Sequence, residues 1–141
     1  MSAFDAIKNI AASGMSAQRL RVQLAASNIA NAETTRTPEG GPYRRKEPVF
    51  QAMLLEQTRD GTPVTGVGVV GIQSSQDPFV SKYDPGHPDA DADGMVQYPN
   101  VNPVEEMVNL TESERSFEAN VAVVRAVRTM ELSAQDLLRV Q

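Results

Sequence analysis

The feature that most limits how this chain can fold is its last segment, Asn102 to Gln141, which contains no Gly or Pro after Pro103. Apolar residues recur in this segment at steps of three and four, as on one side of an amphipathic helix. Asn102 is a suitable N-cap, and Pro103 suits the first helical position. A helix of this length would extend about 60 Å, longer than one small domain needs. We therefore expect its apolar side to be covered by something outside the helix itself.

Residues 3–32 carry a second helical pattern, in which Ala and Ser fill most positions between the apolar residues. Ser2 could cap this helix. Gly14 lies in its middle, where Gly costs about 1 kcal/mol relative to Ala, so we expect a close helix–helix contact there. Asn28 and Asn31 interrupt the apolar face near its end. They are either fraying residues or groups that form specific hydrogen bonds to a partner.

The segment between the two helical patterns has a different composition. All nine prolines lie from Pro38 to Pro103, and eight of the nine glycines lie from Gly40 to Gly94, which excludes long helices. Asp60-Gly61 is typical of a hairpin turn. The expected strands are Tyr43–Lys46, Val49–Leu55, Val64–Gln73, Phe79–Tyr83 and Met95–Tyr98.

These patterns together predict an α+β fold. Long N- and C-terminal helices pair as a coiled-coil-like hairpin, and a small glycine-rich antiparallel β module is inserted between them. The expected boundaries are 1–32 for the first helix, 33–102 for the β module and 103–141 for the second helix. Two narrow apolar stripes cannot enclose a separate core. The hairpin is therefore either self-contained or completed only in a polymer, with partly disordered ends in the single chain.

Charge and composition exclude several classes of function. The net charge is −5, and the only basic cluster, Arg44-Arg45-Lys46, is interpreted as a solvated strand end, so we expect no nucleic-acid partner. Cysteine is absent, which rules out disulfides and thiolate metal sites. The sequence contains no run of 18 apolar residues, so we expect no membrane insertion. Residues 1–30 lack the pattern of a secretory signal, so any export is expected to proceed without a cleaved leader.

Candidate chemical sites are few. His87 is the single histidine, and we interpret it as a turn-stabilising residue. Asp89–Gly94 fits the first half of a calcium loop, but the twelfth position is Asn100 rather than Glu, and nearby prolines exclude an entering helix. An acidic surface loop is the favoured interpretation. We expect no enzymatic activity, no metal and no cofactor.

Four segments resemble the rod and hook protein family of the bacterial flagellum. Leu24–Ala32 is similar to the N-terminal signature of the whole family. The segments Thr35–Lys46, Tyr83–Gly94 and Tyr98–Met107 resemble its proximal-rod members. The similarity extends over nearly the whole chain. It implies a structural subunit of the proximal rod of the basal body, which polymerises through its terminal helices into a hollow, torque-transmitting drive shaft.

The resemblance also implies location and partners. The chain is expected in the periplasm-spanning rod, in contact with copies of itself, with other rod proteins and basal-body components, and with the flagellar type III export apparatus. The residues predicted at subunit interfaces are Leu20, Leu24, Asn28, Asn31, Phe117, Val121, Val124 and Leu137. Two alternatives remain open at this point: a soluble, helix-dimerised β module that binds calcium or another ligand, and a cytosolic coiled-coil regulator.

Overall fold

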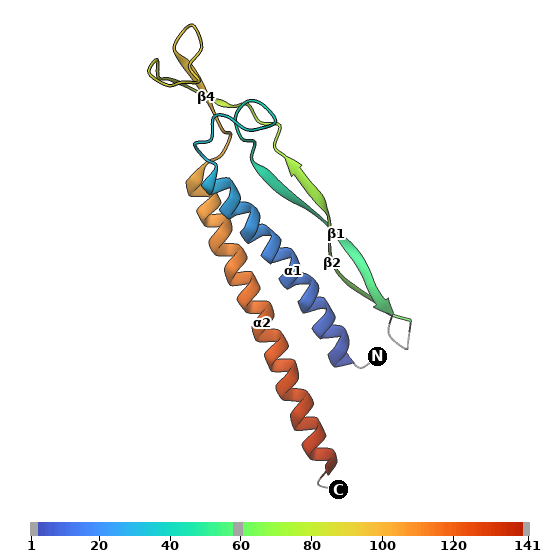
Figure 1. Ribbon diagram of the computed structural model, residues 1–141. Coiled ribbons are helices and arrows are strands. Elements are labelled where there is room, and N and C mark those ends of the chain that lie inside the picture. Colours follow the sequence, from blue (N-terminus) through green and yellow to red (C-terminus); the bar gives the residue numbers. More distant parts are fainter. Residues whose placement is uncertain (1–2, 58–60, 140–141) are drawn as a thin grey trace. The chain divides into compact units, whose positions relative to one another are not determined.

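The structure of the protein, a computed structural model, describes residues 3–57 and 61–139. Helices at the two ends of the chain flank four strands within these residues (Figure 1). The elements are α1 (Ala3–Ala30), β1 (Lys46–Gln57), β2 (Pro63–Ser74), β3 (Val80–Tyr83), β4 (Met95–Tyr98) and α2 (Pro103–Arg139). The α+β prediction is confirmed. The expected cap Ser2 and the turn residue Asp60 lie outside the described residues.

The chain divides into two compact units. Unit 1 comprises residues 1–20, 49–71 and 112–141, and unit 2 comprises residues 21–48 and 72–111. Each unit therefore contains part of both helices together with strand residues. Across the residues that the structure describes, neither helix combines the length and the apolar composition that crossing a bilayer requires.

In unit 1 the two helices pair in opposite directions. Lys8 Nζ lies 2.7 Å from Glu131 Oε1, whereas a Cβ on Gly14 would lie 3.1 Å from Asn120 Nδ2. Advancing along α1 therefore means moving back along α2, as the hairpin prediction requires. The carboxylates of Glu131 and Asp5 raise the pKa of Lys8 above its ordinary value. The short distance at Gly14 confirms the predicted close helix–helix contact.

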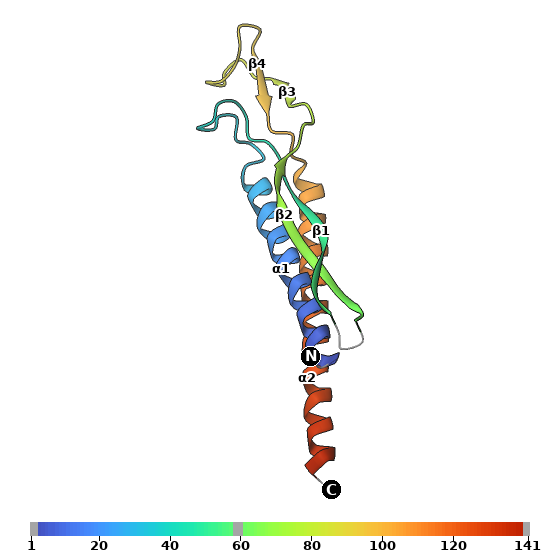
Figure 2. The ribbon, with the colours of Figure 1, turned by 90° about the vertical axis from the view of Figure 1, so that its right-hand side faces the viewer.

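Strands β1 and β2 form a two-stranded sheet that runs beside α1 in unit 1 (Figures 1 and 2). Ser13 on α1 fixes this contact, because its Oγ accepts a hydrogen bond of 3.1 Å from the Val67 N–H. The same hydroxyl donates to the Ile10 carbonyl at 2.7 Å. Gly66 makes the approach possible, since a Cβ there would lie 2.5 Å from Ser13 Oγ and 2.6 Å from Leu55 Cδ1.

In unit 2, β3 and β4 pair antiparallel, with Val80 opposite Tyr98 and Tyr83 opposite Met95. The predicted strand Met95–Tyr98 is confirmed. Helix α2 begins as expected, because the Asn102 side chain accepts a hydrogen bond of 3.1 Å from the Val104 N–H.

The predicted strand Tyr43–Lys46 is wrong, since β1 begins only at Lys46. The Tyr43 N–H donates to the Thr34 carbonyl, and the Arg45 N–H donates to the Asn100 side chain, so neither amide joins a strand ladder. The next predicted strand, Val49–Leu55, is instead the middle of the longer β1. Pro48 is tolerated within β1 because every strand of a two-stranded sheet has a free edge. Phe79 precedes β3, which begins at Val80.

Candidate functional site

The centre of unit 2 is the side chain of Asn28, which is 1% exposed. Its Oδ1 accepts hydrogen bonds of 2.9 Å from the Lys46 N–H and from the Tyr43 hydroxyl. Its Nδ2 donates to the Lys46 carbonyl at 2.9 Å and to Glu106 Oε2 at 3.0 Å. An amide side chain can make four such bonds, so its capacity is fully used within the chain.

Glu106 connects this amide to a buried ion pair. The carboxylate is 2% exposed, and its Oε1 accepts a hydrogen bond of 2.6 Å from Arg45 Nε. Burial opposes the charge of Arg45, but the hydrogen bond and charge of Glu106, aided by Glu47 and Glu105, raise the pKa of Arg45 above its ordinary value. The interpretation of the basic cluster as a solvated strand end is therefore wrong for Arg45. A buried carboxylate needs a paired cation, and Arg45 supplies it.

Asn31 also forms its hydrogen bonds inside unit 2. Its Nδ2 donates to the Ser27 carbonyl at 2.9 Å, and its Oδ1 accepts from the Thr34 hydroxyl at 3.2 Å. Both asparagines of the family-like signature thus fix the end of α1 and the loop that follows it. Their contact with a second subunit stays a prediction.

The other predicted interface residues differ in exposure. Leu24 is buried in unit 2, whereas Leu20, Phe117, Val121 and Val124 are half-buried in unit 1. Leu137 is 74% exposed. The structure therefore brings Leu24, Asn28 and Asn31 into one unit and the remaining five into the other, and their role between subunits stays a prediction.

Unit 1 leaves many large apolar side chains exposed. Its described buried apolar residues are Ala6, Ala11, Ala17, Val64 and Val127, most of them small. Sequence reasoning missed the strand part of this surface, although adjacent apolar pairs such as Met53-Leu54 and Val69-Val70 place apolar groups on both faces of a strand. The exposed set is Ile7, Ile10, Met53, Leu54, Val67, Val69, Val70, Val123, Met130, Leu132, Leu137 and Leu138.

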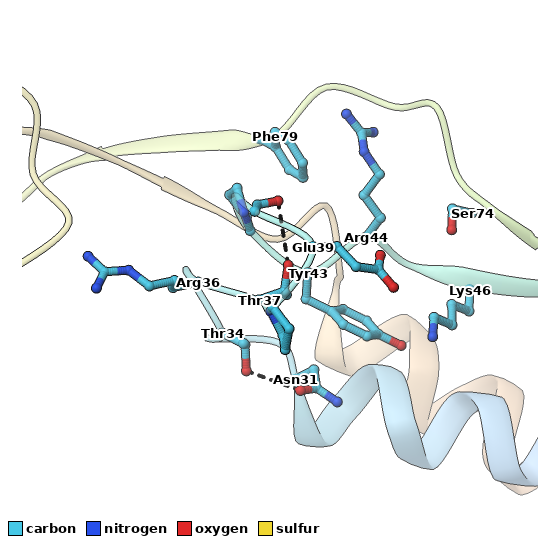
Figure 3. A pocket seen from close by; sticks show the side chains of 13 residues that line it. Asn31, Thr34, Arg36, Thr37, Glu39, Tyr43, Arg44, Lys46, Ser74 and Phe79 are labelled. Atoms are coloured by element: carbon cyan, nitrogen blue, oxygen red, sulfur yellow. Dashed lines mark hydrogen bonds between the residues drawn. The ribbon is translucent and has the colours of Figure 1, made fainter.

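A cleft of about 550 Å³ opens on unit 2 beside this network, and we call it the Lys46 cleft. The loop 34–43 and the side chains of Arg44, Lys46, Ser74 and Phe79 line it (Figure 3). The Arg44 guanidinium lies 4.2 Å from the centre of the Phe79 ring. This cleft was also missed, because nothing in the local pattern shows that residues 34–46 and 74–79 come together.

The acidic loop uses its carboxylates for local hydrogen bonds. Asp91 Oδ1 accepts from the N–H groups of Asp93 and Met95 at 2.9 and 2.8 Å. The described residues contain no group of three or more His, Asp or Glu side chains placed to hold a metal ion. His87 Nδ1 accepts a hydrogen bond of 3.1 Å from the Asp89 N–H, which confirms its turn-stabilising role.

Asp89 joins this loop to the loop after α1. Its carboxylate accepts a hydrogen bond of 2.8 Å from the Thr35 hydroxyl and forms an ion pair with Arg36. The Thr35 hydrogen bond is the main cause of a lowered pKa for Asp89. Desolvation opposes the effect, and the charge of Arg36 adds to it.

Comparison with known proteins identifies the family to which this chain belongs. Residues 9–36 match the family model described as flagella basal body rod protein, and residues 92–137 match the model of the C-terminal part of the flagellar basal body rod FlgEFG proteins. The two matches cover most of α1 with the following turn, and β4 with most of α2. They define the class as flagellar rod proteins.

Several similar proteins match almost end to end. The flagellar basal-body rod protein FlgC of Borreliella burgdorferi is 40% identical over 152 residues, covering 99% of both chains. The FlgC proteins of Salmonella typhimurium and Bacillus subtilis are 43% and 39% identical, covering 93% and 97% of this chain and 95% and 99% of their own. The chain belongs to the FlgC family of flagellar basal-body rod proteins.

Proposed function

We propose that this protein is a structural subunit of the proximal rod of the bacterial flagellar basal body, rather than an enzyme. The full-length similarity to proteins named flagellar basal-body rod protein supports the rod assignment. The described hydrogen bonds of the polar network serve to hold backbone segments together, which suits a structural role. No observation favours the alternatives of a calcium-binding module or a cytosolic regulator.

The observation that carries the mechanism is the exposed apolar surface of unit 1. Burying a Leu or Val side chain contributes about 1.5–3 kcal/mol, so neighbouring copies that cover these residues gain a large stabilisation. The chain polymerises by packing its terminal helices against those of adjacent subunits, and the resulting hollow shaft transmits torque. The eight predicted interface residues are proposed to contribute to this packing. We also propose a division of the chain into a terminal helical domain (1–32 and 103–141), which polymerises, and a β module (33–102) inserted within it.

Location and partners follow from the same proposal. The subunit is exported by the flagellar type III apparatus and is incorporated into the rod that spans the periplasm. There it contacts copies of itself, other rod proteins and further basal-body components.

Leu137→Asp tests the proposal without disturbing the interior of either unit, because Leu137 is 74% exposed. Gln135→Asp, also at an exposed position of α2, is the matched control. Both variants should keep the helix content of the parent chain by circular dichroism. Only Leu137→Asp should lower motility and the amount of protein found in purified basal bodies. Normal swimming and normal incorporation of Leu137→Asp would contradict the proposed role of α2.

A further inference from the structure

The Lys46 cleft contains two cations that have no carboxylate partner within the described residues. Arg44 donates to the carbonyls of Ser75 and Asp77, at 3.2 and 3.5 Å, and stacks on Phe79. The Lys46 ammonium lies 5.7 Å from the centre of the Tyr43 ring. Glu39 also lines the cleft, but it forms no ion pair with either cation. The cleft is therefore a positive opening on a chain whose net charge is −5.

The complementary charge lies on α2. Glu114 and Glu118 are exposed, are four residues apart on one side of the helix, and form no ion pair within the described part of the chain. Two like charges at this spacing destabilise a helix unless a cation is supplied from elsewhere. These two carboxylates equal the two unpaired cations of the cleft in number and are opposite to them in charge.

We propose that the Lys46 cleft of one subunit receives the Glu114–Glu118 side of α2 from a second copy of this chain. The inference rests on the proposed function, because it specifies one contact of the polymer. The cleft and the helix side are different surfaces, so the contact is heterologous and cannot close into a two-fold dimer. Such a contact builds a ring where the rotation between copies closes and an open helical array where it does not; a rod requires the open array.

Cysteine cross-linking tests this contact cleanly, because the chain has no cysteine of its own. Two differently tagged chains, one with Lys46→Cys and one with Glu118→Cys, are co-expressed, and purified basal bodies are treated with a short bismaleimide. We expect a cross-linked dimer carrying both tags, about tenfold more abundant than with Lys82→Cys replacing Lys46→Cys. Lys82 is a suitable control because it is an exposed lysine of unit 2 that does not line the cleft.

A charge exchange gives an independent readout. Lys46→Glu and Glu118→Lys should each reduce motility at least several-fold, and the two changes in one chain should restore it. Glu112→Lys combined with Lys46→Glu should not restore motility, because residue 112 faces a different side of the helix from residue 118. Basal bodies that contain both tagged chains without a mixed dimer would overturn the contact and leave the rod function intact. A Lys46→Cys chain linked only to another rod protein would also overturn it. Absence of the chain from basal bodies would overturn the proposed function itself.

Discussion

The two units of the molecule are stabilised in opposite ways. Unit 2 satisfies its own polar groups, since Asn28, Glu106 and Arg45 are buried or largely buried and hydrogen-bonded to one another or to backbone. In unit 1, small residues allow close contacts between elements: Gly14 of α1 lies against Asn120 of α2, and Gly66 of β2 lies against Ser13 of α1. Many of its larger apolar side chains remain exposed. Unit 2 has exposed apolar side chains as well, among them Val104 and Met107, so the units differ in what holds them together: a buried polar network in unit 2 and close contacts of small residues in unit 1.

The strongest way to test this comparison is to remove the carboxylate at the centre of unit 2. Glu106→Ala removes the buried partner of Arg45 Nε and of one Asn28 N–H, so that only the more exposed Glu47 still pairs with Arg45, whose side chain is 24% exposed. Breaking such a buried pair costs about 3 kcal/mol, which urea unfolding followed by circular dichroism would detect. Glu105→Ala, at an exposed position of the same turn, should change stability by less than about 0.5 kcal/mol. Equal effects of the two variants would show that the network contributes little.

The contact that joins the strands to α1 in unit 1 should be sensitive to a single methyl group. Gly66→Ala places a Cβ 2.5 Å from Ser13 Oγ and 2.6 Å from Leu55 Cδ1, so these side chains or the strands themselves must move. Overpacking of this kind costs about 1–3 kcal/mol, measurable as a lower midpoint of thermal unfolding. Gly71→Ala is the control, because its added methyl group would meet open space and its backbone is not left-handed. A midpoint unchanged by Gly66→Ala would show that Ser13 and Leu55 yield without loss of stability and would contradict the prediction.

The smallest expected effect concerns acid and the loops of unit 2. Because the pKa of Asp89 in the folded protein lies below its ordinary value of 3.8, its contact with Thr35 stabilises the fold fully above that value. This contribution is lost as the pH falls through the folded pKa. The amide signals of Thr35 and Asp89 in NMR spectra should therefore shift together in the acid range. Asp89→Asn should abolish this joint shift, and a shift that persists in the variant would point to another group.

The helices could be predicted from sequence because their signals are local. Asn102 and Pro103 mark the start of α2, and the steps of three and four mark its length. The polar network could not be predicted, since Arg45, Asn100 and Glu106 are brought together by loop conformations that no local period encodes. The motif around Asn28 and Asn31 drew attention to the right residues. Sequence alone could not show that their amides are used inside the chain, because an interrupted apolar face fits internal and external partners equally well.

The fully bonded amide of Asn28 has a mechanical consequence. Sliding the end of α1 along the start of α2 by a single residue, about 1.5 Å, would break the hydrogen bond of 3.0 Å from Asn28 to Glu106. The remaining bonds of the amide, to Tyr43 and the Lys46 backbone, hold the segment after α1 to the same helix end. The amide therefore opposes axial shear between the two helix ends, because any slippage must first break a buried hydrogen bond.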